Sequence, residues 1–167
     1  MPALPSSDFA EELHSGELRD WIIKLREWGF IHAGRGERTL QMWICCYLVE
    51  KFFLSESAVY GFRPIIIEER AVDGGADIGD IMLPSSQVEG KIDVWVEIKN
   101  YFGCNTLSDT EVKKLERDFI KCRANIDAGG LGVVLITMDR VEDARAFASP
   151  LELKYEGVQV VIIGKGG

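Results

Sequence analysis

Asp80 lies before a predicted turn, and Glu97 and Lys99 lie after it. Their spacing could bring two carboxylates and an ammonium group together in a reactive site. The chain reads ADIGDIML, then PSSQVEGK, then IDVWVEIKN, so two apolar-rich strands flank a segment of turn-forming residues. If this hairpin pairs around a midpoint near Val88, Asp80 lies opposite Glu97, with Cβ atoms about 5 Å apart. Lys99 is two residues beyond Glu97 and shares its face. Such a set can hold a divalent cation beside an ammonium group, as phosphodiester hydrolysis requires.

The alternation of residues in the second of these strands predicts which face is buried. One face carries Ile92, Val94, Val96 and Ile98, and the other carries Asp93, Trp95, Glu97 and Lys99. A strict period of two predicts a strand with one core face, and a slip of one residue would bury the charges. Asp77 is three positions from Asp80 and would point to the opposite face of a regular strand. Asp80 is therefore preferred, unless a bulge at Gly79 re-aims the pair.

The rest of the chain predicts the elements that position this hairpin. We expect helices over 9–28, 37–53, 109–126 and 142–147, and strands over 63–72, 78–83, 91–100, 132–138 and 157–163. Ser108 or Asp109 is the expected N-cap of the third helix. The order α-α-β-β-β-α-β-α-β predicts an α/β fold with a central mixed β-sheet flanked by helices on both faces.

Composition narrows the classes of function. The chain has 167 residues, which suits a single domain over 1–167, and a net charge of −8, which argues against a simple nucleic-acid binder. Its four cysteines form no CxxC pair and its two histidines stand far apart, so a zinc site is not expected. We expect the cysteines to be free, buried thiols in an intracellular, reducing compartment. No apolar run is long enough to span a membrane and the N-terminus has no signal-peptide features, so no membrane association is expected.

The arrangement resembles the PD-(D/E)xK nuclease superfamily, which includes restriction endonucleases and Holliday-junction resolvases. The matching residues are Asp80 and Glu97-Ile98-Lys99, and Gly36-Glu37-Arg38 looks like the start of the helix that adds a glutamate in resolvase-like members. Glu50 is a weaker alternative to Glu37. The resemblance covers about 34–163 and implies a restriction-endonuclease-like fold, with 1–33 as an N-terminal helical addition.

Two departures from the family pattern are visible in the sequence. Gly79 stands where the proline that gave the motif its name would be, although many members lack that proline. No Gln-x-x-x-Tyr motif follows the lysine, so the RecB-like exonuclease branch is disfavoured.

The resemblance implies a Mg²⁺- or Mn²⁺-dependent endonuclease that hydrolyses DNA. Asp80, Glu97 and the carbonyl of Ile98 would bind the metal, and Glu37 would complete the catalytic set. Lys99 would orient or deprotonate the attacking water, or neutralise charge that develops on the phosphate. No organic cofactor is implied. A homodimer stays open, because cutting two strands often takes two copies.

Basic residues offer two candidate surfaces for a nucleic-acid backbone. Lys113, Arg117 and Lys121 repeat every four residues on the third predicted helix and could contact phosphates. The favoured interpretation is a solvated face, whose charge is balanced by Glu111, Glu116 and Asp118. Arg35 and Arg38 lie close to Glu37 in sequence and are better placed to touch a substrate strand.

Three interpretations of Asp80, Glu97 and Lys99 remain as alternatives to a catalytic site. The charges on the hairpin could form an exposed cross-strand salt bridge of little energetic consequence. The chain could be a noncatalytic or partner-dependent subunit with the same fold, acting as a protein-interaction or nucleic-acid-binding module. It could also be a small α/β module that binds an unrelated ligand.

Overall fold

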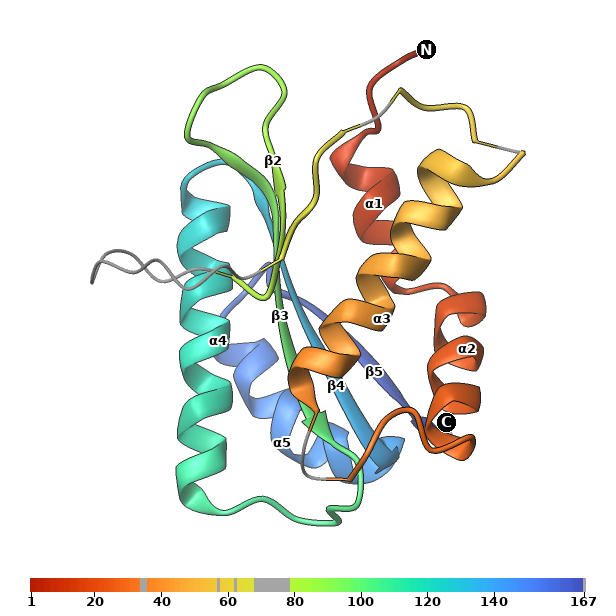
Figure 1. Cartoon of the computed structure of the whole chain (residues 1–167). Coiled ribbons are helices and arrows are strands. Elements are labelled where there is room, and N and C mark those ends of the chain that lie inside the picture. Colours follow the sequence, from red (N-terminus) through yellow and green to blue (C-terminus); the bar gives the residue numbers. More distant parts are fainter. Residues whose placement is uncertain (34–35, 57, 62, 68–78, 167) are drawn as a thin grey trace.

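The computed structural model describes residues 1–33, 36–56, 58–61, 63–67 and 79–166. In this part of the chain, one sheet with the strand order β1-β2-β3-β4-β5 runs through the centre of the molecule (Figure 1). The strands are β1 (Ile66–Ile67), β2 (Ile81–Pro84), β3 (Ile92–Tyr101), β4 (Leu131–Arg140) and β5 (Gln159–Lys165). The first three pair antiparallel and the last three pair parallel. The predicted mixed sheet is confirmed.

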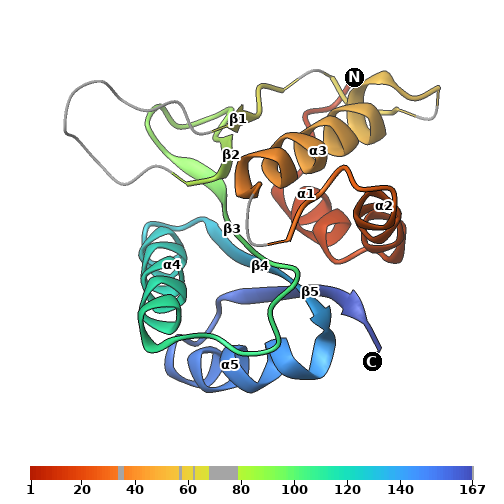
Figure 2. The same cartoon turned by 60° about the horizontal axis from the view of Figure 1, so that its bottom comes forward.

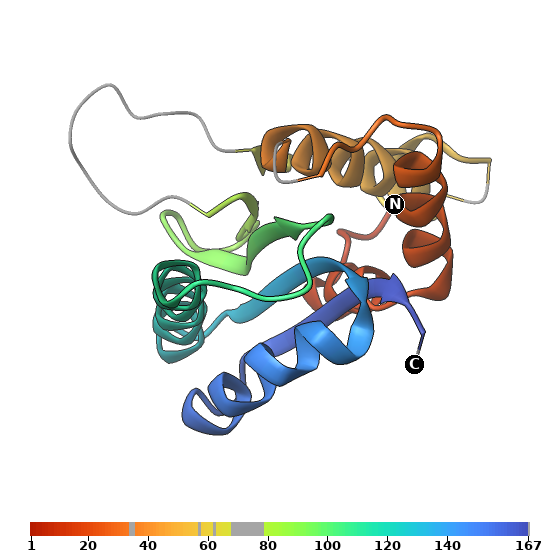
Figure 3. The same ribbon diagram turned by 90° about the horizontal axis from the view of Figure 1, so that it is seen from below.

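Helices cover both faces of the sheet, as predicted (Figures 2 and 3). One face is covered by α1 (Ser6–Leu13), α2 (Gly16–Glu27) and α3 (Glu37–Val49), which continues into the π-helical turn η1 (Glu50–Leu54). The other face is covered by α4 (Asp109–Asp127) and α5 (Val141–Lys154). The Oγ of Ser108 accepts a hydrogen bond from the backbone N–H of Glu111, so Ser108 is the N-cap of α4.

The sheet separates two hydrophobic cores, and β3 contributes to both. Val94, Val96 and Ile98 are fully buried against the α1–α3 layer. Trp95 and Tyr101 pack on the opposite side, with α4 and α5. The predicted alternation of β3 is therefore confirmed, and Glu97 and Lys99 lie on the face that α4 covers.

The register of the hairpin also agrees with the sequence prediction. Ile81 pairs with Val96 across β2 and β3, so one further step places Asp80 opposite Glu97. β2 pairs with β3 only from Ile92 to Val96. In the described residues, the second half of β3 is therefore open on this side, and the candidate site lies there.

Several predicted boundaries were wrong. The helix expected over 9–28 is two helices, because the Oγ of Ser15 accepts the backbone N–H of Leu18 and caps a new helix. The last helix does not stop at 147 but runs to Lys154, with Pro150 inside it. Of the strand expected over 63–72, only Ile66–Ile67 is a strand in the described residues, and 68–72 lie outside them, as does Asp77.

Two further predictions concern cysteines and membranes. The four cysteines are free, but only Cys45 and Cys122 are buried, whereas Cys46 is exposed. Among the described residues, no helix combines the length and the apolar character needed to cross a bilayer.

Candidate active site

Asp80 lies directly before β2 and is almost completely buried, with 6% of its surface exposed. Its Oδ2 accepts the backbone N–H of Ile98 at 2.5 Å, and its Oδ1 accepts the side-chain amide of Gln41 at 2.6 Å. In a continued ladder Ile98 would lie opposite Gly79. The carboxylate of Asp80 thus satisfies a strand N–H beyond the point where β2 begins, and this fixes its position.

Glu97 is even more buried, at 2% exposed, and one of its oxygens has two polar neighbours. Its Oε1 accepts the indole N–H of Trp95 at 2.7 Å and lies 3.5 Å from the Nζ of Lys121. Gly79 makes room for that indole, since a Cβ built on Gly79 would lie 2.8 Å from it. The glycine before Asp80 therefore has a packing role next to Glu97.

Lys99 is held between carboxylates from two different layers. Its Nζ lies 3.1 Å from Oδ2 of Asp118 on α4 and 3.4 Å from Oε1 of Glu37 on α3. Burial alone would lower the pKa of Lys99, but Asp118 and Glu37 outweigh this effect, so its pKa lies above the ordinary value. Lys99 is therefore a charged ammonium group at neutral pH.

The electrostatics indicate that the carboxylates are close enough to repel one another. Burial, followed by the charges of Asp80 and Asp118, raises the pKa of Glu97 to about 8. Burial also raises the pKa of Asp118 and of Glu37, against the lowering effect of Lys99. We call Glu37, Asp80, Glu97, Lys99, Asp118 and Lys121 the carboxylate–lysine cluster. Its four carboxylates outnumber its two ammonium groups, so it would attract a further cation.

Elements from both helical layers bring the cluster together at the open edge of β3. Glu37 and Gln41 are one turn apart on α3 and therefore share a face. Asp118 and Lys121 are likewise neighbours on α4. The described part of β2 pairs with β3 up to Val96, and α3 reaches Lys99 beyond this pairing.

The donor set suits a hard divalent cation that keeps most of its water. Mg²⁺ is commonly bound through one or two carboxylates, with waters completing its octahedron. Asp80 and Glu97 are opposed carboxylates, and the carbonyl of Ile98 lies between Glu97 and Lys99 in the chain. In the described ranges, no group of three or more His, Cys, Asp or Glu side chains is arranged to hold a metal ion. The fit is therefore to a two-carboxylate site and not to a full protein cage.

The structure brings four predicted site residues together and leaves the others outside. Asp80, Glu97, Lys99 and Glu37 meet as described above. Glu50 is exposed at the start of η1 and has no recorded contact with the cluster, so the structure favours Glu37 over Glu50.

The predicted basic surfaces are only partly realised. Arg35 lies outside the described residues, and Arg38 is exposed on α3 next to Glu37. Lys113 and Arg117 are exposed on α4, as a solvated face would be. The expectation that Lys121 continues this face was wrong, because its side chain turns toward Glu97 and only 25% of it is exposed.

Sequence reasoning missed two residues of the site. The charge pattern of α4 predicts that Asp118 belongs to the solvated face, yet it is 4% exposed and pairs with Lys99. Its spacing does indicate burial, since Asp118 lies three residues after Leu115 and four before Cys122, and both of these are buried. The second residue is Gln41, for which the sequence offers one indication, its position one turn after Glu37.

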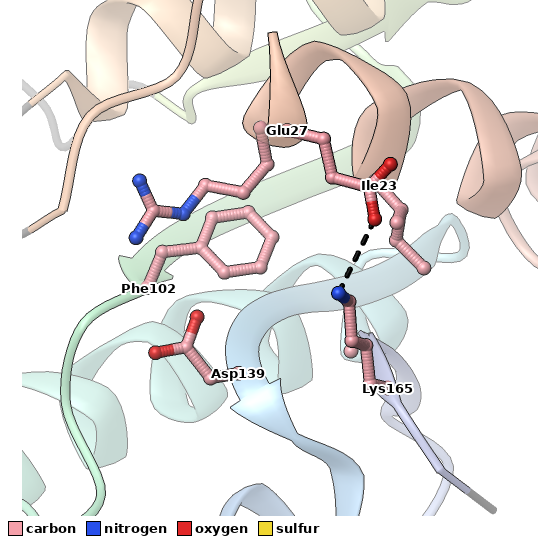
Figure 4. A pocket seen from close by; sticks show the side chains of 7 residues that line it. Ile23, Glu27, Phe102, Asp139 and Lys165 are labelled. Atoms are coloured by element: carbon pink, nitrogen blue, oxygen red, sulfur yellow. Dashed lines mark ion pairs between the residues drawn. The ribbon is translucent and has the colours of Figure 1, made fainter. Parts of the chain in front are cut away.

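A separate hollow of about 320 Å³ lies at the carboxyl ends of the parallel strands (Figure 4). It is lined by Ile23, Arg26, Glu27, Phe102, Asp139, Gly164 and Lys165. Lys165 pairs with Glu27 at 3.2 Å, and the guanidinium of Arg26 lies 5.4 Å from the centre of the Phe102 ring. None of these residues belongs to the carboxylate–lysine cluster.

Comparison of the chain with protein-family models, with curated proteins and with solved structures gave no match. Support for a function therefore comes from the geometry of the described residues.

Proposed function

We propose that this chain is a divalent-metal-dependent endonuclease of the PD-(D/E)xK type that hydrolyses phosphodiester bonds of DNA. The observation that carries the proposal is the register that opposes Asp80 and Glu97, with Lys99 held on the same face as Glu97. The mixed sheet flanked by helices supports a restriction-endonuclease-like fold as part of this proposal. Burial also supports it, because charges at such depth need a reason to be retained.

Asp80, Glu97 and the carbonyl of Ile98 would hold Mg²⁺ or Mn²⁺. When bound, such a cation supplies a water of lowered pKa and neutralises charge on the phosphate. The fixed carboxylate of Asp80 would set the position of this site, because the N–H of Ile98 and the amide of Gln41 both orient it.

Lys99 would act as a charged donor to a phosphate oxygen and not as a general base. Two carboxylates within 3.4 Å keep its proton in place. An ammonium group at this position would stabilise the negative charge that develops in the transition state. Glu37, whose side chain is 42% exposed, would face the entering substrate and orient the attacking water. Arg38 is exposed on the same helix and would contact the phosphate backbone.

The test is cleavage of supercoiled plasmid and of short DNA and RNA duplexes, with Mg²⁺, Mn²⁺ or EDTA. We expect cleavage of DNA that needs the cation and is lost in Glu97→Gln and Lys99→Ala. Glu37→Gln should be slowed by about 10²-fold or more, as expected for a group that positions a reacting water. Glu50→Gln, an exposed glutamate outside the cluster, is the matched control and should keep full activity. Equal cleavage by wild type and Glu97→Gln would overturn the proposal.

A noncatalytic subunit with the same fold is the second candidate, and one observation favours it. The lysines of the cluster already pair with three of its four acidic residues, since Lys99 lies between Glu37 and Asp118 and Lys121 reaches Glu97. Such a closed network can stabilise a fold without chemistry. Binding of Mn²⁺ without cleavage of any of the tested duplexes would favour this candidate over the nuclease.

A further inference from the structure

Asp118 is a buried carboxylate on the apolar stripe of α4, and it lies directly against Lys99. It is 4% exposed, between the buried Leu115 and Cys122 on the same helix face. Its Oδ2 lies 3.1 Å from the Nζ of Lys99. We infer that Asp118 is a positioning residue, which fixes the ammonium group of Lys99 beside the Asp80–Glu97 pair. The consequence for catalysis rests on the proposed function, whereas the positioning itself does not.

The cost of burying Asp118 indicates that it is not there to stabilise the fold. Lys99 compensates its buried Oδ2 at 3.1 Å, and no other donor reaches this oxygen in the described residues. An apolar pair of similar volume is often neutral or stabilising in place of a buried ion pair. The hydroxyl of Tyr101, two residues from Lys99 on the same face, is a buried polar atom without a hydrogen-bond partner in the described residues. A buried polar atom without a partner is rare in folded proteins, and a role at a functional site is one explanation for it.

The geometry also explains why a single carboxylate would not be enough to fix the position of Lys99. A lysine side chain has a flexible stem of four carbons and loses rotamer freedom when it is fixed. Glu37 holds Lys99 from the α3 side, but its own side chain is 42% exposed. Asp118 holds it from the α4 side, and its side chain is only 6% exposed. Without Asp118, Lys99 would follow Glu37 toward solvent and away from Glu97.

Four variants of the full chain separate positioning from simple stability. Asp118→Leu removes the anchor, and Asp118→Asn keeps an oxygen that can accept a hydrogen bond from Lys99. Asp118→Leu/Lys99→Met removes both charges and should have a Tm at least as high as that of wild type. This result would show that leucine at position 118 does not by itself prevent folding. Asp127→Asn is the matched control, because Asp127 lies on the same helix and its side chain is 63% exposed.

The first measurement does not need activity. The protein is acylated briefly with an amine-reactive ester, and labelling of each lysine is quantified by peptide mass spectrometry, with exposed Lys113 as internal standard. We expect Lys99 to react about tenfold faster in Asp118→Leu, less so in Asp118→Asn, and at the wild-type rate in Asp127→Asn. Unchanged labelling of Lys99 in a folded Asp118→Leu protein would overturn the inference. Because this measurement stands alone, an inactive wild type would refute the nuclease proposal without deciding the role of Asp118.

The second measurement tests the catalytic consequence if the wild type cleaves DNA. Asp118→Leu should lower kcat by about 10²-fold while KM for the duplex and the affinity for Mn²⁺ stay within about threefold. Asp118→Asn should recover part of the lost kcat. An unchanged kcat in Asp118→Leu would contradict the role of Asp118 in the reaction.

Discussion

Replacing Glu97 by glutamine should stabilise the cation-free protein while it removes the proposed activity. Glu97 is 2% exposed, and burial together with Asp80 and Asp118 raises its pKa from 4.5 to about 8. The folded state therefore binds a proton that the unfolded state releases between these two values. The stability that the neutral form contributes is complete below about pH 4.5 and is lost as the pH rises through about 8. Glutamine keeps the shape and does not titrate.

The size of the effect follows from this difference in pKa. At pH 7, keeping Glu97 protonated opposes folding by about 3 kcal/mol, which is roughly 1.4 kcal/mol for each pH unit above 4.5. Glutamine should retain the hydrogen bond from Trp95, and Lys121 needs no separate correction, because its lowering effect is already part of the pKa of about 8 and a neutral Glu97 forms no ion pair. Glu97→Gln should therefore be more stable than wild type by about 3 kcal/mol at pH 7, or about 6–12 °C in Tm. At about pH 5 the difference should fall below about 1 kcal/mol.

The assay is urea unfolding in EDTA, followed by circular dichroism at several pH values from about 5 to 8. The difference in free energy of unfolding between variant and wild type should grow with pH over this range, with unchanged m-values. Glu50→Gln should show no such trend. A difference that does not vary with pH, or a wild type that is the more stable protein throughout, would refute the reasoning about Glu97.

Three further predictions follow from the same geometry. Gly79→Ala places a Cβ against the indole of Trp95, 2.8 Å away, so we expect a loss of about 1–3 kcal/mol in urea unfolding and reduced cleavage. Gln41→Leu removes the amide that orients Asp80 and should weaken Mn²⁺ binding by about 10–100-fold in calorimetry; an unchanged affinity would exclude this supporting role. Ser15→Ala removes the N-cap of α2 and should cost about 1 kcal/mol of stability while cleavage is unchanged, which a urea titration and a plasmid assay would check.

The hairpin could be predicted from the sequence because its register depends on residues that are close together in the chain. A strict alternation from Ile92 to Ile98 and a short turn leave only one register that keeps the charges off the core. That register places Asp80 opposite Glu97, and the structure agrees. The capped start of α4 at Ser108 was equally local and was also predicted.

The remainder of the site depends on contacts between segments far apart in the chain. Gln41 is 39 residues from Asp80, and no local sequence pattern predicts that α3 contacts the β2–β3 hairpin. Its charge predicts that Asp118 is solvated, as charged residues on helices usually are, although its spacing places it on the buried stripe. The break between α1 and α2, in contrast, is visible in the spacing of apolar residues. The gap from Leu13 to Leu18 is five residues, longer than the three or four of one continuous helix.

The most direct test is a crystal of the protein soaked with Mn²⁺, whose anomalous scattering locates the ion. The central claim is that the carboxylates of Asp80 and Glu97 share one cation at the open edge of β3. We predict an anomalous peak within coordination distance of an oxygen from each residue, roughly 2.0–2.3 Å, and no peak there in Glu97→Gln crystals. A soaked wild-type crystal with no peak between these two carboxylates, or with Mn²⁺ bound only elsewhere, would contradict the account.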